Sequence, residues 1–169
     1  MRKKHIALLI LLLTFLGSTV GNIAANPDII ATATLYASKS YIPVGQVTVA
    51  VSDSSLIVTF TTTGDWEMTE THLYVGDIPP DKLAPGKFPF KHEDLGGVTS
   101  DEYVIPLAQG GILYIAAHAV VETDDGCWQE ETAWGWLRCH SYTFGRGNQD
   151  PTYVPALSGW GWYFRVLVP

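Results

Sequence analysis

Apolar and polar residues alternate along much of the chain, and this pattern predicts β-strands. The apolar positions of the clearest pair of segments are Val47, Val49, Val51, Leu56, Val58 and Phe60. A repeat of two residues is that of an extended strand, in which successive side chains point to opposite faces. Turn-forming residues, Asp53-Ser54-Ser55, lie between the two segments. We therefore expect a β-hairpin here.

Similar segments continue to the end of the chain and predict eight or nine strands in all. The remaining ones cover residues 31–37, 68–76, 101–107, 112–121, 128–137 and 160–168. Many short strands separated by turn residues are typical of an all-β fold, here an antiparallel β-sandwich of the jelly-roll or Ig-like kind. Residues 77–97 are rich in proline and lack periodicity, which predicts one long ordered loop.

The first 25 residues have the layout of a secretory signal peptide. Three basic residues precede an apolar run from Ile6 to Leu16, and small residues follow as far as Ala25. The run is short for a membrane span, so an uncleaved anchor, with membrane contact only through this leader, is the alternative. We expect a signal peptide at 1–25, an extended segment at 26–43, a sandwich domain at 44–169, and a secreted or cell-surface location.

Charge argues against a nucleic-acid partner. The formal net charge is −7, and residues 1–25 hold three basic and no acidic residues, so a processed chain has −10. Such a chain repels phosphate backbones. Charged residues make up 16% of the sequence, below the roughly 25% of a typical soluble domain. Much of the surface is therefore neutral, as expected of a protein that contacts other subunits.

The two cysteines, Cys127 and Cys139, predict a disulfide if the protein is exported. The bond would close a loop of about a dozen residues and contribute on the order of 3 kcal/mol. A metal-binding pair is the weaker interpretation, because two thiolates do not complete a zinc site. Two reduced thiols are expected if the chain is not exported.

Four segments together resemble a module of secreted and cell-surface proteins of bacteria and archaea. They read E-T-H-L-Y-V-G (70–76), P-G-K-F-P-F-K-H (85–92), L-Y-I-A-A-H-A-V-V (113–121) and E-E-T-A-W-G (130–135). The resemblance implies an extracellular setting and a β-rich module. It assigns no catalytic residue to this chain.

Four polar residues could form a transition-metal site if their strands are neighbours. Glu70 and His72 are two residues apart and share a strand face, while His118 and Glu131 belong to later strands. Two imidazoles and two carboxylates are suitable ligands, and such a site could support a metal-dependent hydrolase. The favoured alternative is a hydrogen-bonded polar layer beneath the loop at 77–97, because no H-E-x-x-H motif is present.

An acidic turn could hold calcium, the one ion that we consider as a cofactor. Asp124 and Asp125 lie among further carboxylates, and hard oxygen ligands suit a weak extracellular calcium site. The spacing of an EF-hand is absent, however, and Asp-Gly is also an ordinary hairpin turn. A solvated acidic loop is therefore the favoured alternative.

Tryptophan pairs could form a binding surface. Trp134 and Trp136 share one strand face, as do Trp160 and Trp162. Aromatic rows can stack on sugar rings, as in a carbohydrate-binding module, or they can pack in a core or a subunit interface. We favour the core or interface, because Phe164 continues the face of the second pair.

These features favour an exported structural or cell-surface protein, not an enzyme, that self-assembles into a filament or surface layer. The expected partner is another copy of the chain, and residues 26–40 could complete a neighbour's sheet as a donor strand. The alternatives are a carbohydrate-binding adhesin, whose partner would be a glycan, and a metal-dependent hydrolase.

Overall fold

The structure, a computed structural model, describes residues 26–37, 41–80, 84–124, 128–138, 140–143 and 161–169. The elements are β1 (Asp28–Ala37), β2 (Ile42–Ser52), β3 (Ser55–Thr62), β4 (Glu67–Gly76), η1 (Pro85–Lys87), β5 (Phe90–His92), β6 (Ser100–Pro106), β7 (Gly111–Asp124), β8 (Trp128–Trp136), β9 (Ser141–Thr143) and β10 (Trp162–Val168). The predicted all-β fold is confirmed. No helix in these ranges is long and apolar enough to cross a membrane.

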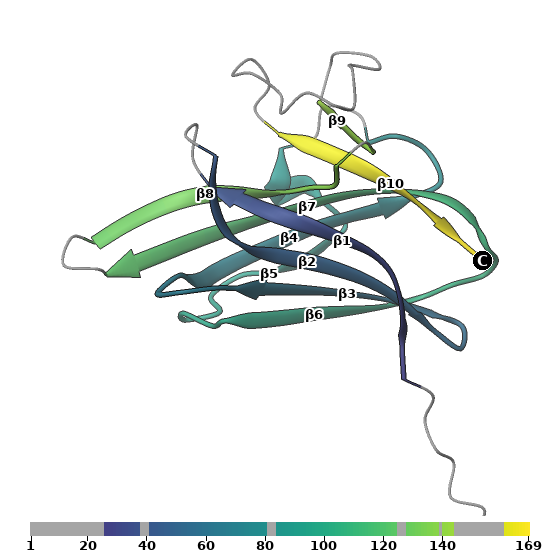
Figure 1. Ribbon diagram of the computed structural model, residues 1–169, viewed down its shortest axis with the longest axis horizontal. Coiled ribbons are helices and arrows are strands. Elements are labelled where there is room, and N and C mark those ends of the chain that lie inside the picture. The colour runs from purple at the N-terminus through teal and green to yellow at the C-terminus, as the bar shows by residue number, and fades with distance from the viewer. Residues whose placement is uncertain (1–25, 38–40, 81–83, 125–127, 139, 144–160) are drawn as a thin grey trace, which may run out of the picture.

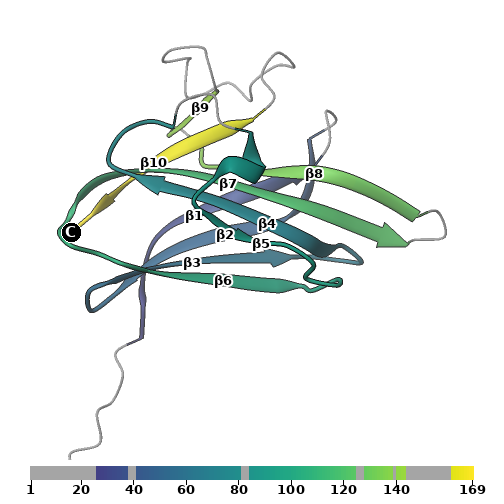
Figure 2. The same ribbon diagram turned by 180° about the vertical axis from the view of Figure 1, so that it is seen from behind.

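All the strands belong to one antiparallel sheet that is nearly closed. Its order is β5-β4-β7-β8-β1-β2-β3-β6, and β10 adds to β7 and carries β9. In Figure 1 strands β1 and β2 lie in front of β4 and β7, and the reverse view in Figure 2 exchanges the two layers. The expected sandwich core is thus enclosed by a single sheet that curls over itself.

The core lies between the two layers and is filled by the residues that alternate along the strands. The large side chains without solvent exposure include Leu35, Val47, Val49, Leu56, Val58, Phe60, Leu73, Ile115 and Phe164. Burial of each such side chain contributes about 1.5–3 kcal/mol. The β2–β3 hairpin forms as predicted, with Ser52 opposite Ser55. Asp53 in its turn has a φ of 51°, a conformation that aspartate tolerates.

Strand β1 occupies an interior position in the sheet. It pairs with β2 along Asp28–Ala37 and with β8 only over its last four residues, Thr34 to Ala37. The segment that the sequence set apart at 26–43 therefore contains a strand of the chain's own sheet. Within the described residues, the first half of β1 has no strand on its β8 side.

Strands β8 and β10 share one edge of β7. The edge pairs with β8 from His118 to Asp124 and with β10 from Gly111 to Ile115. Strand β8 ends at Trp136, and β10 takes over its position beside β7 (Figure 1). The backbone before β10 lies very close to β8 at this point, because a Cβ added at Gly161 would be only 2.6 Å from the Trp134 ring. Glycine is therefore needed at this position.

A side-chain network joins the two ends of the sheet, where β4 and β5 approach β6. Asp101 accepts hydrogen bonds from Thr71 and from Nδ1 of His92, the latter at 2.9 Å. The hydroxyl of Tyr103 donates to the carbonyl of Thr71 at 3.0 Å, and the His92 ring stacks on Tyr103 at 4.4 Å. Burial raises the pKa of Tyr103 to about 12, so its phenol stays protonated as a donor.

The segment predicted as a long loop contains two short elements. Helix η1 is followed by Phe88, which is buried, and β5 pairs with Thr71 to Leu73 of β4. The segment is thus held to the sheet by one aromatic side chain and by three residues of strand pairing. Its sequence is too rich in proline for this short strand to be recognised by periodicity.

Candidate functional site

One row of directly opposed residues crosses the outer face of five strands. It runs from Lys91 on β5 through His72, His118 and Trp134 to Tyr36 on β1. The residues next to these in sequence, such as Leu73 and Ala133, face the core. Opposed residues of antiparallel strands lie on one face and touch, so the row brings both histidines together.

His72 and His118 form a buried pair. Their Nδ1 atoms are 3.2 Å apart, and the residues are 4% and 5% exposed. Burial lowers the pKa of His118 to about 3, and the neighbouring His72 contributes to the shift. Burial also lowers the pKa of His72, although the carboxylate of Glu70 acts in the opposite direction. Both imidazoles are therefore neutral near pH 7.

The surrounding carboxylates determine which nitrogen carries each proton. Two neutral imidazoles that meet through Nδ1 need one donor and one acceptor. Nε2 of His72 lies 3.8 Å from a carboxylate oxygen of Glu70 and 3.9 Å from one of Glu93. A proton on this Nε2 faces negative charge, which is favourable. His72 is then the acceptor at Nδ1, and His118 donates its Nδ1 proton.

An aromatic layer covers the histidine pair. Its buried rings are Phe88, Trp134 and Trp162, which pack with Ala116. The rings around them are Tyr36, Tyr41, Tyr74, Trp136 and Tyr163. The ring of His118 meets that of Trp134 edge to face at 4.7 Å. Trp134 and Trp162 are each 7% exposed, so they pack as a second core outside the sheet. Trp136 is half-buried beside them, and Trp160 lies outside the described residues.

Three of the four residues proposed as metal ligands lie on this outer face, and one does not. Glu131 is opposite Val121, which faces the core, so its side chain is on the other side of the sheet from Glu70, His72 and His118. In the part of the chain that the structure describes, no group of three or more His, Cys, Asp or Glu residues could hold a metal ion. Metal binding therefore stays a prediction, and the contact that these histidines make is a hydrogen bond.

The acidic turn is described only in part. Asp124 is exposed at the end of β7, and Asp125 lies outside the described residues. Beside it, Glu67, Glu122 and Glu130 stand opposite one another on β4, β7 and β8. Calcium binding stays a prediction.

The proposed disulfide would connect residues on either side of β8. Both Cys127 and Cys139 lie outside the described residues. Strand β8 between them is extended over nine residues, from Trp128 to Trp136, a length of about 30 Å. A disulfide needs Cα atoms within about 7 Å. An extended β8 therefore opposes a bond within one chain, because few residues lie outside the strand to return over that distance. The disulfide itself stays a prediction.

We expect the protein to contain no internal disulfide. Alkylation of the unreduced, unfolded protein should label both cysteines, or non-reducing electrophoresis should show covalent multimers. Labelling that appears only after reduction of a monomer would contradict the assignment of β8. A Cys139→Ser variant is the control, because it removes an internal bond but still permits a single link between two chains.

A groove of about 340 Å³ separates β1 from β10. Its lining consists of Ile30, Ala31, Ile112, Leu137, His140, Arg165, Val166 and Leu167. In Figure 1 the two strands diverge toward the end of the molecule at which the chain terminates. Ile112 and Leu167 are opposed across β7 and β10 and are 48% and 70% exposed. The groove thus combines apolar walls with the cationic side chain of Arg165 and the imidazole of His140.

Comparison with known proteins leaves the groove and the histidine pair unassigned. No protein-family model, curated protein or solved structure matches this chain. The resemblance to a secreted or cell-surface module stays a prediction, and any functional proposal must rest on the geometry.

The sequence did not indicate the groove. Residues 112–121 predict a strand buried on both faces, but Ile112 at its start is 48% exposed and lies opposite the exposed Leu167 of β10. The groove exists because β1 is displaced along β8 and leaves its first half beside β10. This displacement depends on strand register, which has no local sequence signal.

Proposed function

We propose that the protein is an exported subunit that associates with further copies of itself by adding an extended segment at the groove between β1 and β10. The observation that supports this proposal is the incomplete edge of β1 beside the groove. The leader at residues 1–25 and the low content of charged residues agree with an exported protein of this kind.

Backbone groups give the groove its capacity for strand addition. Within the described residues, β1 has a partner on its β8 side only from Thr34 onward. The first half of the strand therefore presents N–H and C=O groups that can pair with an added strand. The apolar pair of Ile112 and Leu167 stands at the rim, where a partner would remove it from water.

The two alternative functions have less support from the geometry. A glycan platform needs aromatic faces that a sugar ring can reach, whereas Trp134 and Trp162 are buried. A metal-dependent hydrolase needs an accessible metal with an open coordination position. The paired nitrogens of His72 and His118 are buried and hydrogen-bonded to each other.

A charge at the rim of the groove tests the proposal. Leu167→Lys should raise the protein concentration needed for assembly by at least about tenfold, because a desolvated ammonium opposes burial of the surface. Leu167 is 70% exposed, so the fold should not change. Sedimentation and electron microscopy of the purified protein measure assembly.

Val104→Lys is the matched control for this experiment. Val104 is 60% exposed on β6 and takes no part in the groove, so the variant should assemble as the unaltered protein does. The proposal is wrong if the unaltered protein stays monomeric at high concentration. It is also wrong if both lysine variants assemble equally well.

A further inference from the structure

Because β1 and β8 are displaced along each other, each strand has one half whose edge is unpaired, here called its half-edge. Residues Ala133 to Trp136 of β8 pair with β1, whereas Trp128 to Thr132 pair only with β7 within the described residues. The first half of β1 likewise lacks a partner on the side of the strand that faces β8, within the described residues. The two half-edges lie at opposite ends of the existing β1–β8 contact and, like that contact, they can pair in the antiparallel sense.

Negative charge gathers at the end of the molecule that carries the β8 half-edge. Glu67, Glu122 and Glu130 are directly opposed on three neighbouring strands. Both Glu67 and Glu122 place a carboxylate oxygen beside Gly97. A Cβ added at Gly97 would lie 2.6 Å from the oxygen of Glu67 and 3.7 Å from that of Glu122. Opposed like charges are destabilising. None of the ion pairs among the described residues includes these three carboxylates.

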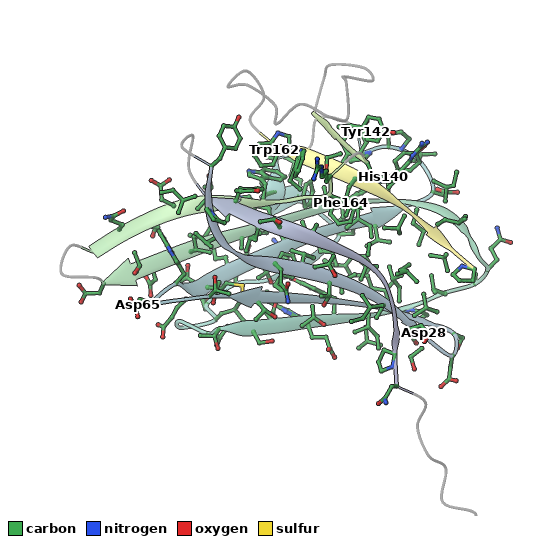
Figure 3. The ribbon with its side chains drawn as sticks, viewed as in Figure 1. Asp28, Asp65, His140, Tyr142, Trp162 and Phe164 are labelled. Carbon is green, nitrogen blue, oxygen red and sulfur yellow. The ribbon has the colours of Figure 1, made fainter. Side chains whose placement is uncertain are left out.

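Positive charge lies at the groove, beside the β1 half-edge. The guanidinium of Arg165, which lines the groove, is 5.9 Å from the centre of the Tyr142 ring. Arg165 is exposed and has no carboxylate partner within the described residues. Figure 3 shows Asp65, next to the acidic end, on the side of the molecule opposite Asp28, the first residue of β1. The acidic end and the start of β1 therefore lie on opposite sides of the molecule.

We infer that copies associate head to tail, with the β8 half-edge of one copy, Trp128 to Thr132, added to the β1 half-edge of the next. This inference rests on the proposed self-association and names its partner surface. The added segment carries the carboxylate of Glu130 on the outer face of its strand, opposite Glu122. Its charge is complementary to that of Arg165, which lines the groove.

The symmetry of the assembly follows from this contact. It joins two different surfaces, so it is heterologous and each copy keeps one half-edge available for the next. Such a contact generates an open chain or a ring, whereas a two-fold contact would end at a dimer. Because opposite charges meet, association should also weaken as salt is added.

Reversal of charge on each surface tests the contact. Arg165→Glu and Glu130→Arg should each raise the concentration needed for assembly by about tenfold, because each places like charges together. A chain that carries both reversals should assemble nearly as well as the unaltered protein, because the opposite charges again face each other. Lys87→Glu and Glu102→Arg are the control reversals, at exposed positions outside both surfaces, and should have no effect.

The possible outcomes separate this inference from the proposed function. If Leu167→Lys blocks assembly while neither reversal does, the groove is the interface but the head-to-tail contact is wrong. If both single reversals block assembly and the double reversal does not restore it, the pairing of these two surfaces is also wrong. An unaltered protein that never assembles overturns both proposals.

Discussion

Replacement of Phe164 by alanine is expected to lower the free energy of unfolding by about 4 kcal/mol, the largest effect that we predict for a single side chain. Phe164 has no solvent exposure and lies opposite Ile115 at the point where β10 takes over from β8 (Figure 3). Its ring occupies the space beside Gly135, where an added Cβ would lie 3.5 Å from it. The alanine variant would leave a cavity where the ring was. The neighbouring Gly135 has no side chain that could move into it.

Equilibrium unfolding in urea measures this effect, and Leu167→Ala provides the matched control. Leu167 is on the same strand but is 70% exposed, so its truncation should change stability by no more than about 0.5 kcal/mol. Equal losses in the two variants would contradict the assignment of Phe164 to the core. A loss confined to Phe164→Ala would show that β10 is an integral part of the domain.

Acidification from pH 7 to pH 5 is expected to remove about 2 kcal/mol of stability through His118 alone. Burial lowers the pKa of His118 from 6.5 to about 3, so the unfolded chain binds the proton before the folded chain does. Stability is therefore complete above the unfolded pKa and falls as the pH drops from about 6.5 toward 3. The groups that face the pair are Trp134, Glu70, Glu93 and Lys91. The two carboxylates lie on the His72 side and favour its protonation.

Substitution of asparagine for His118 isolates this contribution. Asparagine keeps a donor for Nδ1 of His72 but does not titrate, so the loss of stability between pH 7 and 5 should be smaller by about 2 kcal/mol. His140→Asn is the control at an exposed position and should keep the full dependence on pH. Unfolding in urea at several pH values measures both variants. If the stability of His118→Asn depends on pH as strongly as that of the unaltered protein, burial does not lower the pKa of His118 in this way.

The elements that the sequence predicts well depend on local patterns. Val47, Val58 and Phe60 repeat with a period of two, and a turn at Asp53 separates their strands. Both signals act over a few residues, so no distant contact was needed. The same local geometry placed Glu70 and His72 on one face, as the structure has them.

Strand register decided the rest of the candidate site. His118 could meet His72 only if β4 and β7 are neighbours and these two residues are opposed. Glu131 is excluded from the site because it faces the core side of β8. A shift of one residue would reverse each of these results, because successive side chains alternate between faces.

Separation along the chain is a poor guide to distance in space, as the segment between the cysteines shows. Cys127 and Cys139 are separated by about a dozen residues, which suggested a closed loop. Trp128 to Trp136, between the cysteines, form an extended strand and not a closed loop. The network of Asp101, Thr71 and His92 was missed for the opposite reason, since its members come from three strands that meet only when the sheet curls.

By itself, the sequence determined that the chain forms antiparallel β-structure, that the β2–β3 hairpin exists, and which side chains of that hairpin fill the core. These properties follow from residue type and a two-residue period. The tertiary structure alone decided that one sheet encloses the core, that two histidines meet beneath an aromatic layer, and that β1 and β8 are displaced to leave a groove. These depend on which strands are neighbours and in what register, and backbone hydrogen bonds stabilise many registers equally until the side chains of the whole sheet are packed together.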